Sequence, residues 1–323
     1  QAQRQVGSSF KVYVYAAAME QGFTPFDTIL DAPFTTMSGG QAYSPHNYDE
    51  KFEGVITLRR ALDGSRNVPA VKLAEKIGMN SVIDMARRFG ITSPLPPYLP
   101  ITLGAADLNL LEHTSAFTVF PNDGIRIDPH MIRRVTTYDG ALLEQAHPVV
   151  HDVVEPDVAR TMTAMLQDVV ERGTGMPARA LGRPAGGKTG TTNDFTDAWF
   201  MGFTPEITAG VWVGFDDKSV SLGKPETGAI AALPIWLEFM QGALEGKPIQ
   251  AFQNIETLDK VALTKTVKVD TPDTAPEDAG EGPTTITTTP TVPEVAPHVE
   301  IPAKATAPPQ NATLPASTPR NQQ

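Results

Sequence analysis

A serine and a lysine stand three positions apart near the start of the sequence, in Ser8-Ser9-Phe10-Lys11. Apolar residues recur at helical spacing after this motif and Gly22 supplies a stop, which predicts a helix that begins just after Ser8. Residues i and i+3 of a helix share one side, so the hydroxyl and the ammonium would lie within hydrogen-bond reach. A buried lysine with a depressed pKa can accept the proton of a serine nucleophile. The pair indicates nucleophilic catalysis, and the structural alternative is that Ser8 merely caps the helix.

Two further motifs could complete such a site. Ser65-Arg66-Asn67 precedes a helix that is predicted to follow Asn67 and to run from Val68 to Ile77-Gly78, and Lys188-Thr189-Gly190 lies far along the chain. Taken alone, the first would cap the helix and the second would carry a solvated strand charge. Brought together by the fold, Lys188 would be the positive neighbour that lowers the pKa of Lys11. The N–H groups at the start of the helix after Ser8 would offer hydrogen bonds to an oxyanion.

The residues around these motifs make the pattern specific. The chain resembles the transpeptidase domain of class A, bifunctional penicillin-binding proteins through Arg4-Gln5-Val6-Gly7-Ser8-Ser9-Phe10-Lys11, Ser65-Arg66-Asn67-Val68-Pro69-Ala70 and Gly187-Lys188-Thr189-Gly190-Thr191-Thr192. Further similarity runs through Asn47-Tyr48-Asp49 and residues 196–200, 211–214 and 226–228, so that it covers roughly residues 1–245. Asp is usual at the position of Arg66 in the general motif trio, and Pro is usual in the family at the position of Val6.

The family places sheet strands, a glycosyltransferase domain and a membrane anchor ahead of the first motif. Only seven residues precede Ser8, so the chain is expected to lack the N-terminal part of such a protein. The resemblance implies a peptidoglycan D,D-transpeptidase that cross-links stem peptides in cell wall biosynthesis and is acylated by β-lactams. It places the parent protein on the periplasmic side of the bacterial inner membrane, with cell-wall synthesis proteins as possible partners.

The resemblance also implies a role for each matching residue. Ser8 would attack the carbonyl between two terminal D-alanines while Lys11 takes its proton, and an amine of a neighbouring stem peptide would finally take the acyl group. Ser65 would relay a proton to the leaving amine. Thr191 lies on the same strand face as Thr189, and its N–H would form the oxyanion hole with that of Ser8. The expected catalytic residues are Ser8, Lys11, Ser65 and Lys188; Asn67 would bind the peptide backbone, Lys188 with Thr189 would face the terminal carboxylate, and Gly190 and Thr191 complete the expected substrate contacts.

The expected fold is α+β, of the kind shared by penicillin-binding proteins and serine β-lactamases, with an antiparallel sheet flanked by helices. Residues 198–203 and 207–215 are strand-like and are joined by Thr204-Pro205-Glu206, which favours an antiparallel pair. One further helix is expected after Pro156, and a stripe of Ile235, Phe239 and Met240 predicts another with these residues in the core. The predicted organisation is a transpeptidase domain over 1–250, a linker over 251–270 and a Pro/Thr-rich disordered tail over 271–323.

Composition narrows the classes of partner. The net charge of −11 disfavours nucleic acid, because a protein that neutralises phosphates needs clustered Lys and Arg. The absence of cysteine excludes thiolate metal sites and disulfides, and the six histidines show no ligand spacing, so no metal or cofactor is expected. No apolar run approaches the roughly 18 residues of a membrane span, so the chain itself is expected to be soluble.

Some features of the sequence are compatible with other functions. Residues 182–189 satisfy the Walker A pattern of nucleotide hydrolases, but their flanks lack the strand and the helix that a phosphate-binding loop requires. A second Ser-x-x-Lys, at residues 221–224, falls in a predicted loop. No Glu-x-x-Leu-Asn pattern of class A β-lactamases stands between Ser65 and Lys188, which disfavours a β-lactamase. The motifs do not separate a transpeptidase from a D,D-carboxypeptidase, and a non-catalytic peptidoglycan-binding chain stays a third possibility.

Overall fold

The computed structural model describes residues 2–253 of the 323-residue chain. The predicted tail and nearly all of the predicted linker lie outside the described residues, so the predicted domain boundaries stay predictions. Among residues 2–253 no helix is long and apolar enough to cross a membrane.

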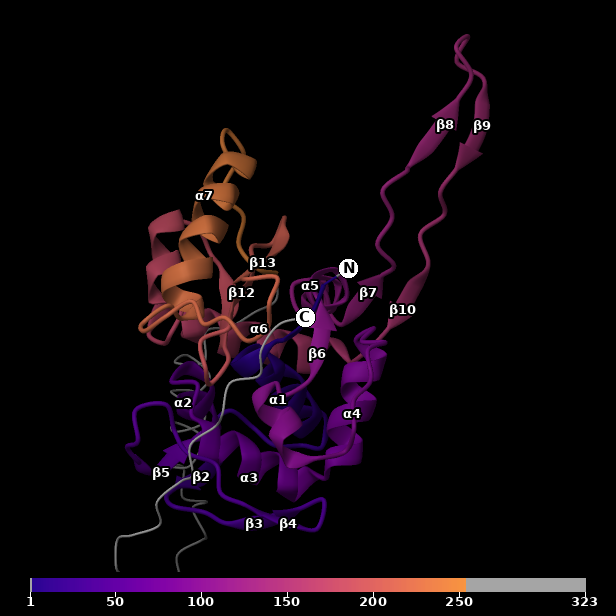
Figure 1. Cartoon of the computed structure of the whole chain (residues 1–323). Coiled ribbons are helices and arrows are strands. Elements are labelled where there is room, and N and C mark those ends of the chain that lie inside the picture. Colours follow the sequence, from indigo (N-terminus) through magenta and orange to yellow (C-terminus); the bar gives the residue numbers. More distant parts are fainter. Residues whose placement is uncertain (1, 254–323) are drawn as a thin grey trace, which may run out of the picture. The chain divides into compact units, whose positions relative to one another are not determined.

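Seven α-helices and four shorter helical turns alternate with strands along the described chain (Figure 1). The helices are α1 (Lys11–Glu20), α2 (Leu58–Asp63), α3 (Asn67–Ile77), α4 (Met79–Arg88), α5 (Leu110–Phe117), α6 (Pro156–Glu171) and α7 (Leu233–Ala243). The turns are the 3-10 helices η1 (Gly7–Phe10), η2 (Leu99–Leu103) and η3 (Met176–Leu181), and the π-helix η4 (Gly228–Ala232).

The strands form one three-stranded sheet and several two-stranded ribbons, all antiparallel. The sheet has the order β11 (Gly186–Thr191), β12 (Asp197–Phe203) and β13 (Thr208–Gly214). The ribbons pair β1 (Gln3–Gln5) with β6 (Asp107–Asn109), β2 (Thr28–Asp31) with β5 (Gly54–Thr57), β3 (Thr36–Ser38) with β4 (Gln41–Tyr43), β7 (Ile125–Ile127) with β10 (Val150–Asp152), and β8 (Arg134–Thr136) with β9 (Leu142–Gln145). In Figure 1 the β8–β9 hairpin extends away from α4 and α5.

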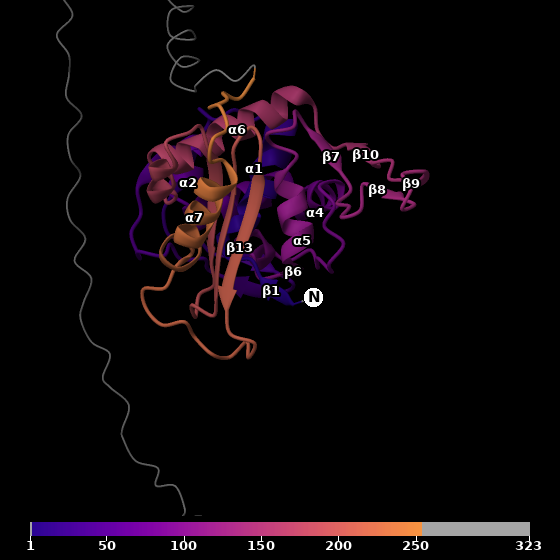
Figure 2. The ribbon, with the colours of Figure 1, turned by 90° about the horizontal axis from the view of Figure 1, so that it is seen from above.

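The sheet lies between two helical layers, with α7 on one face and α1 and α5 on the other (Figure 2). Alternation along β12 explains this arrangement, because successive side chains of a strand point to opposite faces. Trp199, Met201 and Phe203 pack in the cluster that contains α1, whereas Phe200 packs with Trp236 of α7. This is the predicted α+β arrangement of an antiparallel sheet flanked by helices, and the predicted pairing of the strands after Ala198 and after Ile207 is confirmed.

Helix α1 is buried on every side from Lys11 to Met19. A helix with no solvent face belongs to the centre of a domain, and here α3, α4 and α6 surround it. The first motif therefore enters the middle of the molecule directly from the turn η1. The predicted helices after Ser8, after Asn67 and after Pro156 are all confirmed.

The prediction for α7 is correct for the helix and wrong for most of its core face. Met240 is buried, but Ile235 and Phe239 are 51% and 56% exposed. The buried stripe runs instead through Leu233, Trp236 and Met240. Because the helix is apolar on two sides, periodicity alone does not select the side that packs on the sheet.

The segment that matches the Walker A pattern is not a phosphate-binding loop. Its last four residues lie in β11, and a turn and β12 follow where a nucleotide-binding site requires a helix. The nucleotide hydrolase alternative is therefore excluded. The second Ser-x-x-Lys lies outside any helix or strand, as predicted.

Candidate active site

The turn before α1 is fixed by close backbone contacts at Gly7. This residue has a φ of +54°, and a Cβ on it would lie 2.4 Å from the carbonyl oxygen of Thr191. On another side, a Cβ on Gly104 would lie 2.1 Å from the carbonyl oxygen of Gly7. Only glycine allows both approaches. The packing holds Ser8 beside the end of β11, where the third motif lies.

Lys11 is fully buried, and its ammonium contacts the second motif. Its Nζ donates to the carbonyl oxygen of Ser65 at 2.6 Å and to Oδ1 of Asn67 at 2.6 Å. A longer contact of 3.4 Å joins the same nitrogen to Oγ of Ser65. Among the described residues no hydrogen bond joins Ser8 to Lys11, so the direct bond expected from their spacing is absent from this arrangement.

Ser65 lies between the two lysines of the motifs. Lys188, which is fully buried in β11, donates to Oγ of Ser65 at 2.8 Å and to the carbonyl oxygen of Thr189 at 3.1 Å. Ser65 has a φ of +53°, a left-handed conformation that costs a non-glycine residue about 1–3 kcal/mol. Its N–H is bonded to the carbonyl oxygen of Leu62, which helps to hold this conformation. The hydroxyl is thereby aimed at both ammonium groups.

The structural alternatives for these residues fail. No side chain caps η1 or α1, so Ser8 does not serve as a helix cap. Helix α3 begins after Arg66 without a side-chain cap of its own, and Lys188 is not a solvated charge. Helix capping and a solvated surface charge therefore do not explain the positions of Ser8 and Lys188.

Burial changes the protonation of both lysines. Loss of hydration lowers the pKa of Lys11 well below its ordinary value, and the positive charges of Lys188 and Arg66 lower it further. Burial lowers the pKa of Lys188 to about 7. The predicted effect of Lys188 on Lys11 is thus present in the folded chain, and the neutral amine of Lys11 forms more easily than that of a solvated lysine.

A cavity of about 400 Å³ opens over these groups. Its wall combines predicted site residues with further polar groups from other loops: Ser8, Asn47, Tyr48, Asp49, Gly64, Ser65, Arg66, Asn67, Leu103, Thr174, Thr189, Thr191, Thr192, Asn193, Thr227 and Ala229. The hydroxyl groups of Thr189 and Thr174 are 2.8 Å apart, and Oγ1 of Thr191 accepts from the N–H of Gly228 at 3.0 Å. The space suits an extended polar ligand with one end near β11.

Two predicted residues take other positions than expected. Lys188 is buried behind Ser65 and does not line the cavity, so Thr189 and not the ammonium faces the space expected for a carboxylate. Gly190 also lies off the cavity wall, and a Cβ on it would lie 2.3 Å from the carbonyl oxygen of Val6. Its absent side chain permits the nucleophile turn to approach β11.

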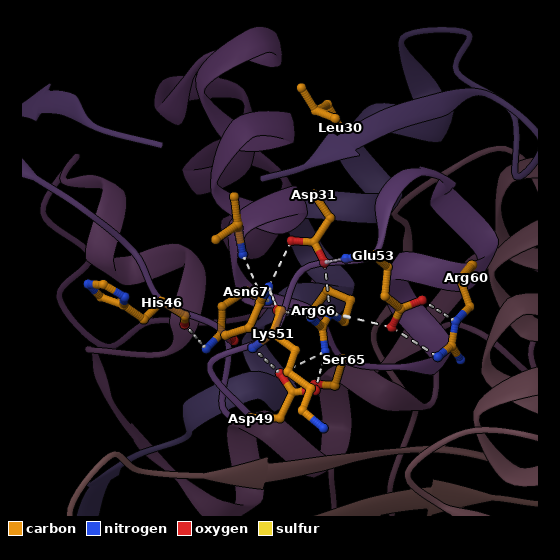
Figure 3. A network of polar contacts seen from close by, with 12 residues as sticks. Leu30, Asp31, His46, Asp49, Lys51, Glu53, Arg60, Ser65, Arg66 and Asn67 are labelled. Atoms are coloured by element: carbon orange, nitrogen blue, oxygen red, sulfur yellow. Dashed lines mark hydrogen bonds and ion pairs between the residues drawn. The ribbon is translucent and has the colours of Figure 1, made fainter. Parts of the chain in front are cut away.

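A network of ion pairs supports the second motif (Figure 3). The guanidinium of Arg66 donates to Oδ2 of the fully buried Asp31 at 3.0 Å and to both carboxylate oxygens of Asp49 at 3.0 Å. It also donates to the carbonyl oxygen of Lys51. Arg66 replaces the Asp of the general motif, and it is here the centre of a set of carboxylates.

Asn47 connects this network to α3. Its Nδ2 donates to Oδ1 of Asp31 at 2.7 Å, while its Oδ1 accepts from the N–H groups of Asn67 at 2.9 Å and Val68 at 3.2 Å. Asn47 therefore caps α3 from a distant segment and orients Asn67. The sequence showed similarity at Asn47-Tyr48-Asp49 but gave no sign of this role; Asp31 had no sequence signal at all.

Within residues 2–253, no group of three or more His, Asp or Glu side chains is arranged to hold a metal ion.

Comparison with known proteins identifies the family. Residues 1–231 match the model of the penicillin binding protein transpeptidase domain. The chain belongs to this family. The identification made from the three motifs and their flanks is thereby confirmed.

Relatives of the transpeptidase domain are long proteins. Penicillin-binding protein 1A of Neisseria meningitidis is 40% identical over 257 residues, which are 76% of this chain and 32% of the relative. The corresponding protein of Aquifex aeolicus is 40% identical over 77% of this chain and 34% of its own length. The chain thus spans about a third of the curated relatives that it matches.

Solved structures support the same family. Penicillin-binding protein 1A from Haemophilus influenzae superposes with a TM-score of 0.74 at 29% identity, over 80% of this chain and 46% of that chain. PonA1 from Mycobacterium tuberculosis, solved in complex with penicillin V, gives a TM-score of 0.69 at 28% identity, over 79% of this chain and 73% of that chain. The fold expected from the sequence is the fold of these transpeptidase domains.

Proposed function

We propose that the chain carries the active site of a peptidoglycan D,D-transpeptidase, with Ser8 as the residue that becomes acylated. The observation that carries this proposal is the convergence of the three motifs on one cavity, with Ser65 bonded to a buried lysine on each side. A serine, a lysine of depressed pKa and a relay hydroxyl are the components of general-base acylation.

In the proposed first step, neutral Lys11 accepts the proton of Ser8 while the hydroxyl oxygen attacks the carbonyl carbon between two terminal D-alanines. A neutral amine keeps two N–H donors and one lone pair. The two short bonds of Lys11, to Ser65 and Asn67, match the two donors, which leaves the lone pair for the proton of Ser8. The proton then passes through Ser65 to the leaving nitrogen, the C–N bond breaks, and free D-alanine departs.

The proposed oxyanion hole consists of the N–H groups of Ser8 and Thr191. Backbone N–H groups alternate in direction along a strand. Because the N–H of Thr192 donates to Asp197 at the β12 side, that of Thr191 points to the open edge of β11. A Cβ on Gly7 would lie 2.7 Å from this nitrogen, so the donor lies beside the nucleophile turn. Two such donors stabilise the negative oxygen of a tetrahedral intermediate.

The proposed substrate is a stem peptide that ends in D-alanine, and β-lactams would react as its analogues. Thr189 and Thr174 supply hydroxyl groups for the terminal carboxylate, and Lys188 contributes positive charge from behind Ser65. Asn67 retains one amide N–H beyond its bond to the carbonyl oxygen of His46, and this N–H is free for the peptide backbone of the substrate. An amine of a second stem peptide then attacks the ester and returns the proton to Ser8.

The protein that contains this chain would act in cell wall synthesis on the periplasmic side of the inner membrane. The names of the relatives support this setting, and class A membership further suggests a glycosyltransferase domain and a membrane anchor in the same protein. Contacts with other cell-wall synthesis proteins are part of the same proposal.

The test is covalent labelling of the 323-residue chain, and of the natural protein that contains it, with a fluorescent penicillin, followed by denaturation. Label should persist on the wild type and on Ser221→Ala, which alters the second Ser-x-x-Lys, and should vanish in Ser8→Ala. Loss of the label with time in the wild type would indicate β-lactamase turnover. A folded protein that takes no label in either form would overturn the proposal and would favour a peptidoglycan-binding role without catalysis.

The acceptor distinguishes the remaining activities. A peptide ending in D-alanyl-D-alanine is incubated with the natural protein, with and without a second stem peptide that bears a free amine. A transpeptidase joins the two peptides and releases one D-alanine per bond. Release of D-alanine by hydrolysis alone would identify a D,D-carboxypeptidase.

A further inference from the structure

His113 of α5 is a fully buried histidine that the proposed reaction does not use. Both ring nitrogens are bonded: Nε2 lies 2.8 Å from Oγ of Ser9, and Nδ1 lies 2.8 Å from the hydroxyl of Tyr13. Phe117 and Trp199 pack edge-on against the ring, with centroids 5.2 Å and 5.9 Å away. Burial lowers the pKa of His113 to about 3, so the imidazole is neutral.

The direction of each hydrogen bond follows from the available donors. Oγ of Ser9 also lies 2.7 Å from the carbonyl oxygen of Val6, which can only accept, so the Ser9 hydroxyl donates there. Ser9 must then accept from His113, which places the single proton of the neutral ring on Nε2. Nδ1 is left as an acceptor, and the hydroxyl of Tyr13 donates to it. The result is one chain of donors from Tyr13 through His113 and Ser9 to Val6.

This chain ends on the turn that carries Ser8. The carbonyl of Val6 immediately precedes Gly7. One residue earlier, the carbonyl oxygen of Gln5 accepts from Nε1 of Trp199 at 2.9 Å. Both Val6 and Ser9 lie against β11, since a Cβ on Gly190 would lie 2.3 Å from the carbonyl oxygen of Val6 and 3.1 Å from Oγ of Ser9. The peptide groups of Gln5 and Val6, which precede the nucleophile, are therefore held by contacts with β11, β12 and α5.

We propose that Tyr13, His113 and Ser9 form a positioning relay that holds the Val6–Ser8 turn, and with it the hydroxyl and N–H of Ser8, in register with Thr191. The proposal rests on the proposed function of Ser8. None of the three relay residues touches the substrate cavity, so the relay acts through the nucleophile. Any buried histidine needs partners for its nitrogens; a positioning role is indicated because this chain of bonds ends at the carbonyl of Val6, directly before Gly7 and Ser8.

The decisive variant removes the distal part of the relay without leaving an unpaired polar group. Tyr13→Phe combined with His113→Leu replaces both partners of one hydrogen bond by apolar side chains, which a core tolerates far better than removal of one partner. Ser9→Ala removes the link to Val6 itself. Tyr15→Phe is the matched control, because Tyr15 is also fully buried on α1 while its hydroxyl has no hydrogen-bond partner among the described residues.

The rate constant of acylation by a fluorescent penicillin is measured separately from the affinity of the preceding complex, and thermal unfolding is recorded for every variant. The relay predicts acylation slower by about ten- to a hundredfold for Ser9→Ala, the loss caused by misplacing reacting atoms by up to about 1 Å. The double variant should be slowed severalfold at unchanged affinity, and Tyr15→Phe should label at the wild-type rate. A folded double variant that labels at the wild-type rate overturns the relay, whereas a wild type without label at Ser8 overturns the proposed function instead.

A spectroscopic measurement tests the direction of the hydrogen bonds at His113 independently of activity. Nitrogen chemical shifts of the His113 ring distinguish the two neutral tautomers, and the relay requires the proton on Nε2. Observation of the Nδ1–H tautomer, or of an imidazolium at neutral pH, would contradict it. Ser9→Ala, in which the acceptor of that proton is gone, should change the Nε2 shift, while Ser8→Ala should leave it in place.

Discussion

Replacing Arg66 by alanine should be among the most destabilising single changes in the domain. The guanidinium and the carboxylate of Asp31 form an ion pair of 3.0 Å in which the side chains are 8% and 0% exposed. Removing one partner of such a buried pair leaves an uncompensated charge and typically costs about 3–5 kcal/mol. The pair with Asp49, whose side chain is 43% exposed, adds little.

The remaining contacts of Asp31 set the magnitude within this range. The carboxylate keeps a donor from Asn47 at 2.7 Å and the N–H of Glu53 at 3.1 Å, which partly stabilise its charge. We therefore expect a loss of about 3 kcal/mol in the free energy of unfolding, the lower end for a broken buried pair. Acylation should slow as well, because Asn47 orients Asn67 through the same carboxylate.

Urea unfolding of matched variants measures this loss. Lys218→Ala is the control, because its ion pair with Asp107 is 2.6 Å long but exposed at 57% and 39%, and such pairs contribute at most about 1 kcal/mol. Adding Asp31→Asn to Arg66→Ala should recover much of the loss, since no buried charge then remains. The reasoning is refuted if Arg66→Ala destabilises no more than Lys218→Ala, or if Asp31→Asn brings no recovery.

Two further predictions concern the nucleophile turn and the lysine of β11. Gly7→Ala should abolish penicillin labelling and lower the unfolding temperature, because left-handed strain of about 1–2 kcal/mol adds to the 2.4 Å approach to Thr191. Gly182→Ala is the control for strain alone, since Gly182 has a φ of +67° and no atom lies within 4 Å of the added Cβ. Equal effects of the two variants would contradict the close packing at Gly7. Between pH 7 and 10 unfolded Lys188 binds more protons than the folded residue, whose pKa is about 7, so stability rises with pH by up to about 1.4 kcal/mol per unit. Urea unfolding at several pH values should show a smaller rise for Lys188→Met, and an unchanged slope would mean that the lysine is not buried as described.

The parts of the fold that the sequence predicted correctly depend on neighbours along the chain. The helix after Ser8 and the hairpin of β12 and β13 follow from spacing and from a short connection. The position of the core stripe on α7 depends instead on which side meets the sheet, and Phe239 shows that an apolar residue on a helix can stay exposed. Periodicity carries no information about the partner of a helix that is apolar on two sides.

The same division applies to the site. Ser8, Ser65 and Thr189 could be named because short motifs mark them, and they do line one cavity. The support for these residues comes from positions with no local pattern, such as Asp31 and His113. A buried carboxylate or imidazole is recognisable only when its partners are known, and those partners lie far away in the chain. Asp31 bonds Asn47 at a separation of 16 residues, and His113 bonds Ser9 at a separation of 104.

The basicity of Lys11 shows why the motif by itself is not the mechanism. An exposed Ser-x-x-Lys on a helix would hold a charged ammonium at neutral pH, and such a group cannot accept a proton. The pKa of Lys11 is lowered because α1 is buried on all sides and because β11 places the charge of Lys188 nearby. Both causes belong to the tertiary structure, as does the glycine contact that brings Ser8 beside Thr191. The second Ser-x-x-Lys lies in a loop and has the same residues without this environment, so its serine is expected to be unreactive.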